Sequence, residues 1–299
     1  CPVGNHVEKS DEIRRLEVLV EGKVPQEYQK LFTNLQETGN TEGATTSPLA
    51  DRLPKFSADK EYVLWLGCFA RYELDPEFTK SVENFTKILD FANVSYGILE
   101  QEHCSGDPVN RLGDKLTYSM LREHNMKQLS EAKKVVTLCP HCALNLEKEY
   151  SKYDAISYTV EHHTQVIEQL ITDGRIQVNQ TAAGKITYHD PCNLGRGNQI
   201  YDPPRKALES INGFKNVEME QSRENGFCCG AGGANPFYTV PEKVKISEIR
   251  VGHAESTGAK VLAVACPFCL SMFDDALKGK NSTNMKVKDI AEIINDSME

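Results

Sequence analysis

The cysteines of this 299-residue chain recur at nearly constant spacing, and no other feature of the sequence constrains the fold as strongly. Four pairs of cysteines are separated by either 124 or 127 residues: Cys68 and Cys192, Cys104 and Cys228, Cys139 and Cys266, and Cys142 and Cys269. The residues around the later pairs also agree, because the segment 133–142 resembles the segment 259–269. Such self-similarity indicates a duplication. We therefore predict two homologous halves, residues 61–175 and 184–297.

Each half is predicted to alternate strands with helices. Four short apolar or β-branched runs are typical of buried parallel strands: Tyr62–Leu66, Val135–Leu138, Ile186–Tyr188 and Val261–Ala265. Between the first two runs, apolar residues at helical spacing over residues 78–89 predict an amphipathic helix, with Asp75 as its N-cap and Pro76 at its first position. The predicted fold class is α/β, with two parallel-sheet halves related by the duplication.

Four cysteines follow these predicted strands directly: Cys68, Cys139, Cys192 and Cys266. Sites in open α/β sheets lie at the carboxyl ends of the strands. We therefore expect the cysteines of each half to gather at one edge of its sheet.

Residues 1–39 and 40–60 precede the repeat. Helices are predicted over Glu12–Val20 and Gln26–Glu37, the second ending before Gly39, and the polar residues 40–60 are predicted to be a linker. The chain begins Cys1-Pro2, without a signal peptide, so we interpret it as the later part of a longer protein. We expect a cytoplasmic location, with any membrane association provided by upstream residues or partner subunits.

Charge and hydropathy exclude some classes of partner. The formal net charge is −9, without a block of Lys or Arg, which argues against binding to nucleic acid or to an anionic membrane surface. The longest nearly apolar runs, Tyr62–Ala70 and Val261–Leu270, are much shorter than the roughly 18 residues of a membrane span.

The cysteine pattern indicates metal ligation. Dense disulfide frameworks belong mainly to small secreted domains, and this chain is not small. The second half offers five thiols in an ordered pattern: Cys192, Cys228, Cys229, Cys266 and Cys269. Thiolates select iron–sulfur clusters or zinc, and four suffice for a tetrahedral zinc site or a cubane cluster, so a fifth is surplus to either. The glycines of residues 230–233 can bring backbone N–H groups close to the sulfurs. A zinc site that uses four of the five cysteines remains the alternative.

Two local motifs of the second half resemble those of a known family. His189-Asp190-Pro191-Cys192 and the segment Phe227–Gly233 are similar to signatures of the cysteine-rich CCG domain of heterodisulfide reductases. Similar pairs of halves occur in iron–sulfur subunits of glycolate oxidase and anaerobic glycerol-3-phosphate dehydrogenase, and in oxidoreductases linked to fatty-acid oxidation. The resemblance covers residues 60–297. It implies that the five cysteines of the second half hold a non-cubane [4Fe–4S] cluster.

The first half departs from this pattern at one position. It keeps Cys68, Cys104, Cys139 and Cys142, but Ser105 stands where the second half has Cys229. Four thiolates are enough for a conventional [4Fe–4S] cluster or for zinc. The third alternative is that the first half binds no metal and has only a structural role.

The first two residues carry a second resemblance. Cys1-Pro2 looks like the end of a bacterial ferredoxin motif, whose last cysteine ligates a cluster. Residues 1–39 are therefore predicted to be a helical segment from the end of a ferredoxin-like domain. Cys1 is a metal-ligand candidate, and further ferredoxin clusters are expected in the full-length protein.

Other polar residues near the motifs carry weaker hypotheses. His162-His163 follows a predicted strand and is interpreted either as a proton donor near a cluster or as a hydrogen-bonded pair at a helix start. His189 and Asp190 would either tune the site or bond to local backbone. His103 and His141 match no recognised ligand, and we assign them no role. The sequence shows neither a flavin or nicotinamide fingerprint nor a Ser, His and Asp constellation for hydrolysis, so we assign no catalytic residue.

The combined interpretation is an oxidoreductase subunit of the heterodisulfide-reductase-like type that transfers electrons. Electrons would pass through the [4Fe–4S] cluster to or from a disulfide, a quinone or a partner flavoprotein. The alternatives are a zinc-binding structural scaffold and a thiol–disulfide oxidoreductase that uses one of the CxxC pairs.

Overall fold

Two parallel four-stranded sheets form the centre of the molecule. The computed structural model describes residues 7–44, 46–178, 184–238 and 242–298. The first sheet has the order β2-β1-β3-β4, and the second has the equivalent order β6-β5-β7-β8. The strands are β1 (Tyr62–Trp65), β2 (Tyr96–Gly97), β3 (Lys134–Thr137), β4 (Thr159–His162), β5 (Gly184–Tyr188), β6 (Phe214–Asn216), β7 (Val261–Val264) and β8 (Lys286–Asp289). The predicted α/β fold with two homologous parallel-sheet halves is confirmed.

Strand pairing follows the same spacing as the cysteines. Leu64 on β1 pairs with Val136 on β3, and Tyr188 on β5 pairs with Ala263 on β7. These two pairs are related by the separations of 124 and 127 residues found for the cysteines. The duplication therefore extends to the register of the central strands, which places the cysteines that follow them at equivalent edges.

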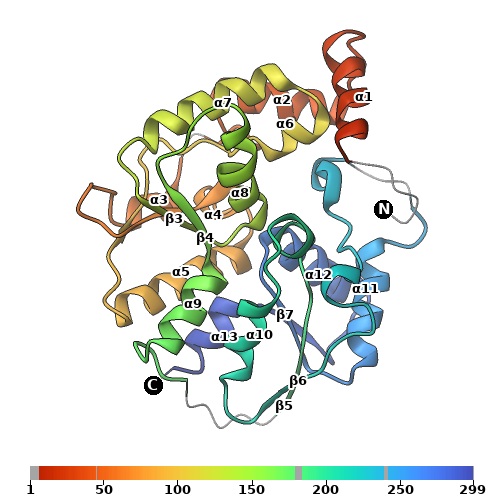
Figure 1. The fold of residues 1–299 in the computed structure, drawn as a ribbon. Helices are drawn as coiled ribbons and strands as arrows, with labels where there is room; N and C mark the ends of the chain where they lie inside the picture. Colours follow the sequence, from red (N-terminus) through yellow and green to blue (C-terminus); the bar gives the residue numbers. More distant parts are fainter. Residues whose placement is uncertain (1–6, 45, 179–183, 239–241, 299) are drawn as a thin grey trace.

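Helices surround both sheets (Figure 1). Those of the first half are α4 (Gly67–Arg71), α5 (Pro76–Phe91), α6 (Asp107–Leu112), α7 (Lys115–Gln128), α8 (Pro140–Leu144) with the turns η1 (Asn145–Glu149) and η2 (Tyr150–Lys152), and α9 (His163–Thr172). Those of the second half are η3 (Asn193–Gly197), α10 (Asp202–Glu209), η4 (Arg223–Asn225), η5 (Gly232–Phe237), α11 (Ile246–Ser256), α12 (Pro267–Gly279) and α13 (Ile290–Asn295).

Helix α5 forms as the sequence predicts. The Asp75 carboxylate accepts hydrogen bonds from the backbone N–H groups of Glu77 and Phe78 at 3.0 and 3.2 Å, and Pro76 occupies the first turn. The apolar residues that predicted the helix are all fully buried: Phe78, Val82, Phe85, Ile88 and Leu89. This face of α5 therefore belongs to the core.

The two halves pack against each other through helices that lie far apart in sequence. Helix α5 of the first half lies against α13 of the second, and α9 lies against α10 (Figure 1). At this interface His163 Nε2 and Asp289 Oδ1 are 3.1 Å apart, and both side chains are completely buried. The halves thus share one continuous hydrophobic core.

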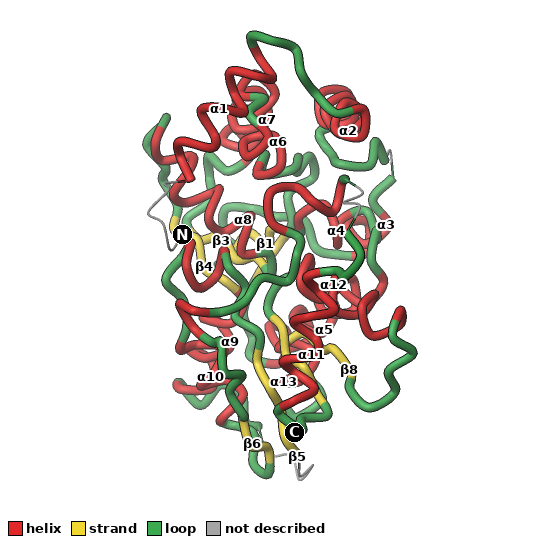
Figure 2. Tube along the Cα trace, turned by 90° about the vertical axis from the view of Figure 1, so that its right-hand side faces the viewer, coloured by secondary structure: helices red, strands yellow, loops and turns green. Residues whose placement is uncertain are grey.

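The region before the repeat is helical, and α1 lies at the periphery in both views (Figures 1 and 2). It contains α1 (Val7–Leu19), α2 (Gln26–Thr38) and α3 (Pro48–Arg52). Helix α2 ends at the predicted Gly39, whose φ of 71° suits a left-handed cap. Residues 40–60, expected to be only a connector, include α3, whose Leu49 and Ala50 are buried in the core. Cys1 lies outside the described residues.

A helix needs about 20 predominantly apolar residues to span a bilayer. Among the described residues, no helix is both long enough and apolar enough to do so.

Candidate metal centres

The four cysteines of the first half meet at the carboxyl edge of its sheet. Cys68 follows β1 at the start of α4, and Cys139 follows β3 immediately before α8. The Cys68 side chain is hydrogen-bonded to Cys104, and that of Cys139 to Cys142. Together they line a cavity of about 20 Å³ whose other walls include Leu66, Phe69, Phe78, Pro108 and Phe268. Ser105, Asp107 and His141 also line the cavity, so the four sulfur atoms share it with three polar side chains.

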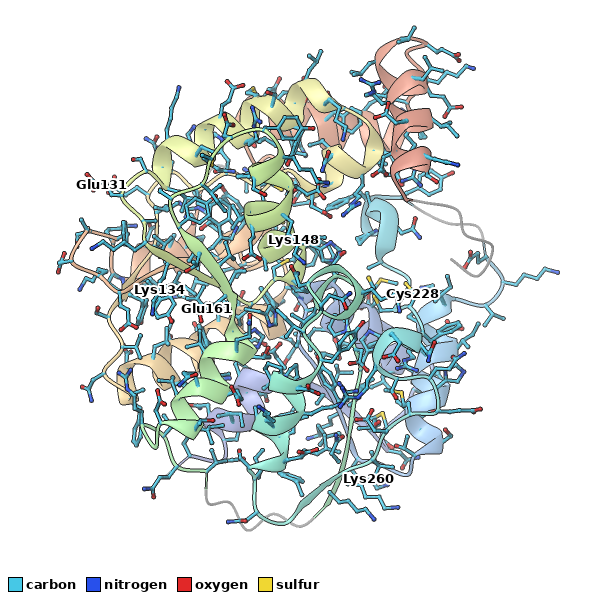
Figure 3. The ribbon with its side chains drawn as sticks, viewed as in Figure 1. Glu131, Lys134, Lys148, Glu161, Cys228 and Lys260 are labelled. Atoms are coloured by element: carbon cyan, nitrogen blue, oxygen red, sulfur yellow. The ribbon has the colours of Figure 1, made fainter. Side chains whose placement is uncertain are left out.

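Five cysteines of the second half gather at the equivalent edge. Cys192 follows β5, Cys266 follows β7, and the adjacent pair Cys228 and Cys229 lies on the loop between η4 and η5 (Figure 3). Hydrogen bonds join Cys229 to both Cys228 and Cys269. The Cys266 side chain is hydrogen-bonded to Cys269. Cys192 lies near these thiols, and negative charge on Cys229 or Cys266 raises the pKa of Cys192. The structure therefore brings together all five candidates of the second half.

Ser105 occupies the position in the first half that Cys229 occupies in the second. The side chain of Ser105 is buried and hydrogen-bonded to Cys142, just as Cys229 is bonded to Cys269. The hydroxyl thus points into the site rather than away from it.

One glycine in each half directs its backbone N–H at a cysteine sulfur. Gly230 donates to Cys228 Sγ at 3.2 Å, and Gly106 donates to Cys104 Sγ at 3.5 Å. Their φ angles are 98° and 89°, a region that residues with a Cβ rarely adopt. The glycine is therefore required at both positions, and its N–H stabilises negative charge on the neighbouring sulfur.

Two thiols of the second half ionise more easily than an ordinary cysteine. Hydrogen bonds from Cys228 and Cys269 hold the pKa of Cys229 well below its usual range. Burial alone would raise the pKa of Cys266, but hydrogen bonds with Cys269 and His141 lower it to about 6. The pKa values of the other three thiols are raised, those of Cys192 and Cys269 mainly by burial and that of Cys228 mainly by its hydrogen bond to Cys229. Metal ligation requires the thiolate, so binding of a metal would release protons from these three thiols.

A buried histidine and a buried arginine lie beside these sulfurs. A ring nitrogen of His189 and the sulfurs of Cys229 and Cys269 all lie within 4.8 Å of one another. Arg250 on α11 is completely buried and donates from Nε to His189 Nδ1 at 3.2 Å. Among the described residues, Arg250 Nη1 and Nη2 have no hydrogen-bond partner, whereas the ring of His189 is hydrogen-bonded to Cys229.

These unpartnered donors indicate the kind of group that fits the second site. The charges of Asp190 and Glu218 act on Arg250, but among the described residues no group is bonded to its terminal nitrogens. A buried cation without a bonded counter-charge is strongly unfavourable. A group ligated by several thiolates carries negative charge and would supply the missing partner. The five sulfurs and the unpartnered donors therefore fit an anionic, thiolate-ligated iron–sulfur cluster, whereas a four-coordinate zinc site would leave one cysteine unused.

The two sites contact each other through the third residue of each Cys-Pro-x-Cys motif. His141 from the first half is hydrogen-bonded to Cys266 of the second, and its Nδ1 lies 3.0 Å from Asp107 Oδ2. Phe268 from the second half lines the cavity of the first, and its ring centroid is 4.8 Å from that of His141. No role was predicted for His141 from the sequence, where its only signal is its place inside a ligand motif.

Asp190 and His162, for which the sequence suggested roles near the clusters, form hydrogen bonds with neighbouring residues. Asp190 receives two hydrogen bonds from Arg205, at 2.7 and 2.9 Å, and one from the Arg223 backbone N–H at 2.7 Å. His162 lies at the start of α9, where Nε2 donates to the Leu138 carbonyl at 3.2 Å and Nδ1 accepts from the Thr164 hydroxyl at 2.9 Å. Both side chains are thus held by local contacts.

Comparisons with known proteins identify the repeated unit. The family of cysteine-rich domains named CCG matches residues 62–147 and 186–274. The probable iron–sulfur-binding oxidoreductase FadF of Bacillus subtilis is 34% identical over 100% of this chain and 44% of its own length. The EtfAB:quinone oxidoreductase of Syntrophomonas wolfei is 31% identical over 100% of this chain and 45% of its own length.

A third relative is shorter. It is one of the subunits of the dihydromethanophenazine:CoB–CoM heterodisulfide reductase of Methanosarcina barkeri, and it is 31% identical over 100% of this chain and 75% of its own length. The chain thus spans less than half the length of the first two relatives but three quarters of this one.

Proposed function

Because this chain belongs to the family of proteins with cysteine-rich CCG domains, we propose that it is an iron–sulfur electron-transfer subunit of a heterodisulfide-reductase-like oxidoreductase. Relatives named as an iron–sulfur-binding oxidoreductase, an EtfAB:quinone oxidoreductase and a heterodisulfide reductase subunit support the redox role. In this proposal the chain works with a redox partner subunit or flavoprotein. The electron acceptor or donor is a disulfide, a quinone or that flavoprotein.

The convergence of five cysteines in the second half is the observation that carries the proposal. Cys192, Cys228, Cys229, Cys266 and Cys269 would hold a [4Fe–4S] cluster of the non-cubane type. When bound, the cluster supplies one-electron chemistry, which protein side chains alone do not provide. Support comes from the unpartnered terminal nitrogens of the buried Arg250 and from the hydrogen bond between His189 and Cys229.

We assign a different role to the first half. Cys68, Cys104, Cys139 and Cys142 would bind a conventional four-thiolate group, because Ser105 offers a hydroxyl where a fifth thiolate would be needed. Support comes from the contacts between His141 and Cys266 and between Phe268 and the first cavity, which join the two groups of cysteines. That arrangement suits the transfer of single electrons between them. Cys1, as a ligand of a ferredoxin-type cluster, stays a prediction.

Burial argues against the dithiol alternative. Thiol–disulfide exchange requires an accessible thiolate that can attack the sulfur of a second molecule. Both cysteines of each CxxC pair are buried, and Cys266, which has the lowered pKa, is only 1% exposed. A protein disulfide cannot reach a sulfur in this position without opening the fold.

Metal analysis separates the main proposal from the zinc scaffold. The whole chain would be purified without oxygen and assayed for iron, acid-labile sulfide and zinc. We expect brown protein with iron and sulfide in near-equal amounts. The Cys192→Ser and Cys269→Ser variants should lose iron from the second half, whereas Ser151→Ala, which changes an exposed serine, should keep the full amount. Colourless protein that contains only zinc would contradict the proposal.

A further inference from the structure

Arg250 is a buried cation that forms no ion pair with a carboxylate of the described residues, although the charges of Asp190 and Glu218 act on it. Its side chain is completely shielded from solvent, and among the described residues neither Nη1 nor Nη2 has a hydrogen-bond partner. The guanidinium group stays protonated in proteins, so the charge persists despite burial. Leaving such a charge unpaired is strongly unfavourable. An arginine in this position therefore indicates an anion that the polypeptide does not provide.

The nearby carboxylates are already occupied. Asp190 is bound by both terminal nitrogens of Arg205, at 2.7 and 2.9 Å. Glu218 is bound by the same arginine at 2.6 Å. Cys269 of the candidate cluster site is the other negative group that acts on Arg250. The missing anion is therefore expected on the side of the cysteines.

His189 links the arginine to the sulfurs. Arg250 donates from Nε to His189 Nδ1, so Nδ1 acts as the acceptor and the proton of the neutral ring is on Nε2. A ring nitrogen of His189 lies within 4.8 Å of the sulfurs of both Cys229 and Cys269. His189 is hydrogen-bonded to Cys229, a candidate ligand, while the terminal nitrogens of Arg250 behind it have no partner among the described residues.

The first half has no histidine at the position equivalent to His189. Trp65 stands 124 residues before His189, at the end of β1. Arg71, a buried arginine of the first half, donates to the carbonyl groups of Leu99 and Glu100 and lies 4.0 Å from the Glu102 carboxylate. That cation is therefore compensated by the protein itself, whereas Arg250 is not.

From this asymmetry we propose that Arg250, with His189 as its positioning residue, is the counter-charge of the cluster in the second half and raises the reduction potential of that cluster. The inference rests on the function proposed above. Reduction by one electron adds negative charge to the cluster. A fixed positive charge in a low-dielectric interior stabilises the reduced form, and hydrogen bonds to the sulfurs act in the same direction.

A redox titration of the whole cluster-loaded chain, followed by electron paramagnetic resonance, tests the proposal. In Arg250→Met the ratio of reduced to oxidised second-half cluster at a fixed potential should fall about tenfold, which corresponds to about 59 mV for a one-electron couple. Arg250→Lys keeps the charge and should restore most of the ratio. The matched control is Arg122→Met on α7 of the first half, where a carboxylate of Asp154 already lies 3.2 Å from the arginine. This variant should leave the titration unchanged.

The cluster-free chain provides a second readout. If the protein does not compensate Arg250, its replacement by the apolar side chain of methionine should leave the urea midpoint of the cluster-free protein unchanged or raise it. A lower midpoint combined with an unchanged potential of the loaded protein would show a purely structural arginine and overturn the inference, while the proposed function would stand. Wild-type protein that binds no iron would overturn both together.

Discussion

Ser105 and Cys229 occupy equivalent positions, and each side chain is hydrogen-bonded to the last cysteine of its own Cys-Pro-x-Cys motif. A hydroxyl is a harder and less acidic ligand than a thiol, so Ser105 does not replace a thiolate on iron. Because Ser105 stands in the place of Cys229, we expect the two halves to bind different metal groups.

Removing a cysteine of the first half tests this difference. We expect Cys68→Ser to abolish a conventional [4Fe–4S] signal and to leave the second-half signal intact, because the side-chain hydrogen bonds of Cys68 join it to Cys104 and Thr41 and to no described cysteine of the second half. Ser105→Ala is the matched control and should retain both signals in electron paramagnetic resonance spectra. Loss of the non-cubane signal in Cys68→Ser would refute the assignment.

His162 provides a prediction for the pH dependence of stability. Burial, together with the neighbouring His163, holds the pKa of His162 well below 6.5 in the folded protein. Below about pH 6.5 the unfolded chain therefore binds a proton that the native state does not, and stability is lost as the pH falls towards the folded pKa. The slope is at most about 1.4 kcal/mol per pH unit.

Urea unfolding of the cluster-free protein at pH 7 and pH 5 would measure this effect. The loss of unfolding free energy between the two pH values should be smaller in His162→Gln than in the wild type, because glutamine does not titrate. Equal losses in the two proteins would show that His162 is not the group responsible.

Among the elements, the central strands and the helices α1, α2 and α5 could be predicted from sequence, but the edge strands β2 and β6 could not. The four central runs were found within one or two residues, because buried parallel strands are apolar on both faces. The edge strands β2 and β6 contain two and three residues, and β6 is partly exposed. Segments this short show no measurable periodicity. Helix α3 was missed because its five residues lie in a polar segment.

The N-cap of α5 offers a test at this scale. Asp75→Ala should lower the free energy of unfolding by about 1 kcal/mol, because two backbone N–H groups lose their acceptor. Asn caps helices as well as Asp does, so Asp75→Asn is the matched control and should change stability little. Chemical denaturation of the three proteins would show the difference, and equal midpoints would mean that Asp75 does not stabilise the helix.

At the scale of the whole molecule, the two halves complete each other's sites. Phe268 of the second half lines the first cavity, and His141 of the first half bonds to Cys266 of the second. The repeat predicts which cysteines belong to each half, but it contains no information on how the halves pack. Arg250 was missed for the same reason, because only folding brings α11 next to His189.

Because a residue of each half contacts the cysteines of the other, we expect a substitution in one half to alter the site of the other half. Phe268→Ala should increase the rate at which cysteines 68, 104, 139 and 142 are alkylated in the cluster-free protein, since the cavity loses one wall. Peptide mapping by mass spectrometry would follow each thiol. Phe91→Ala, at a half-exposed position on α5, is the control and should not change the rates. Unaltered alkylation in Phe268→Ala would show that the first site does not depend on the second half.

The central claim is that five thiolates of the second half hold one [4Fe–4S] cluster, and Cys229 is the ligand that distinguishes this site from a four-thiolate site. Electron paramagnetic resonance and Mössbauer spectra of the anaerobically purified whole chain would be compared with those of Cys229→Ser and of the matched first-half variant Cys142→Ser. We expect Cys229→Ser to lose the non-cubane signal and Cys142→Ser to keep it. An unchanged non-cubane signal in Cys229→Ser would show that Cys229 is not a ligand and that the second site does not need five thiolates.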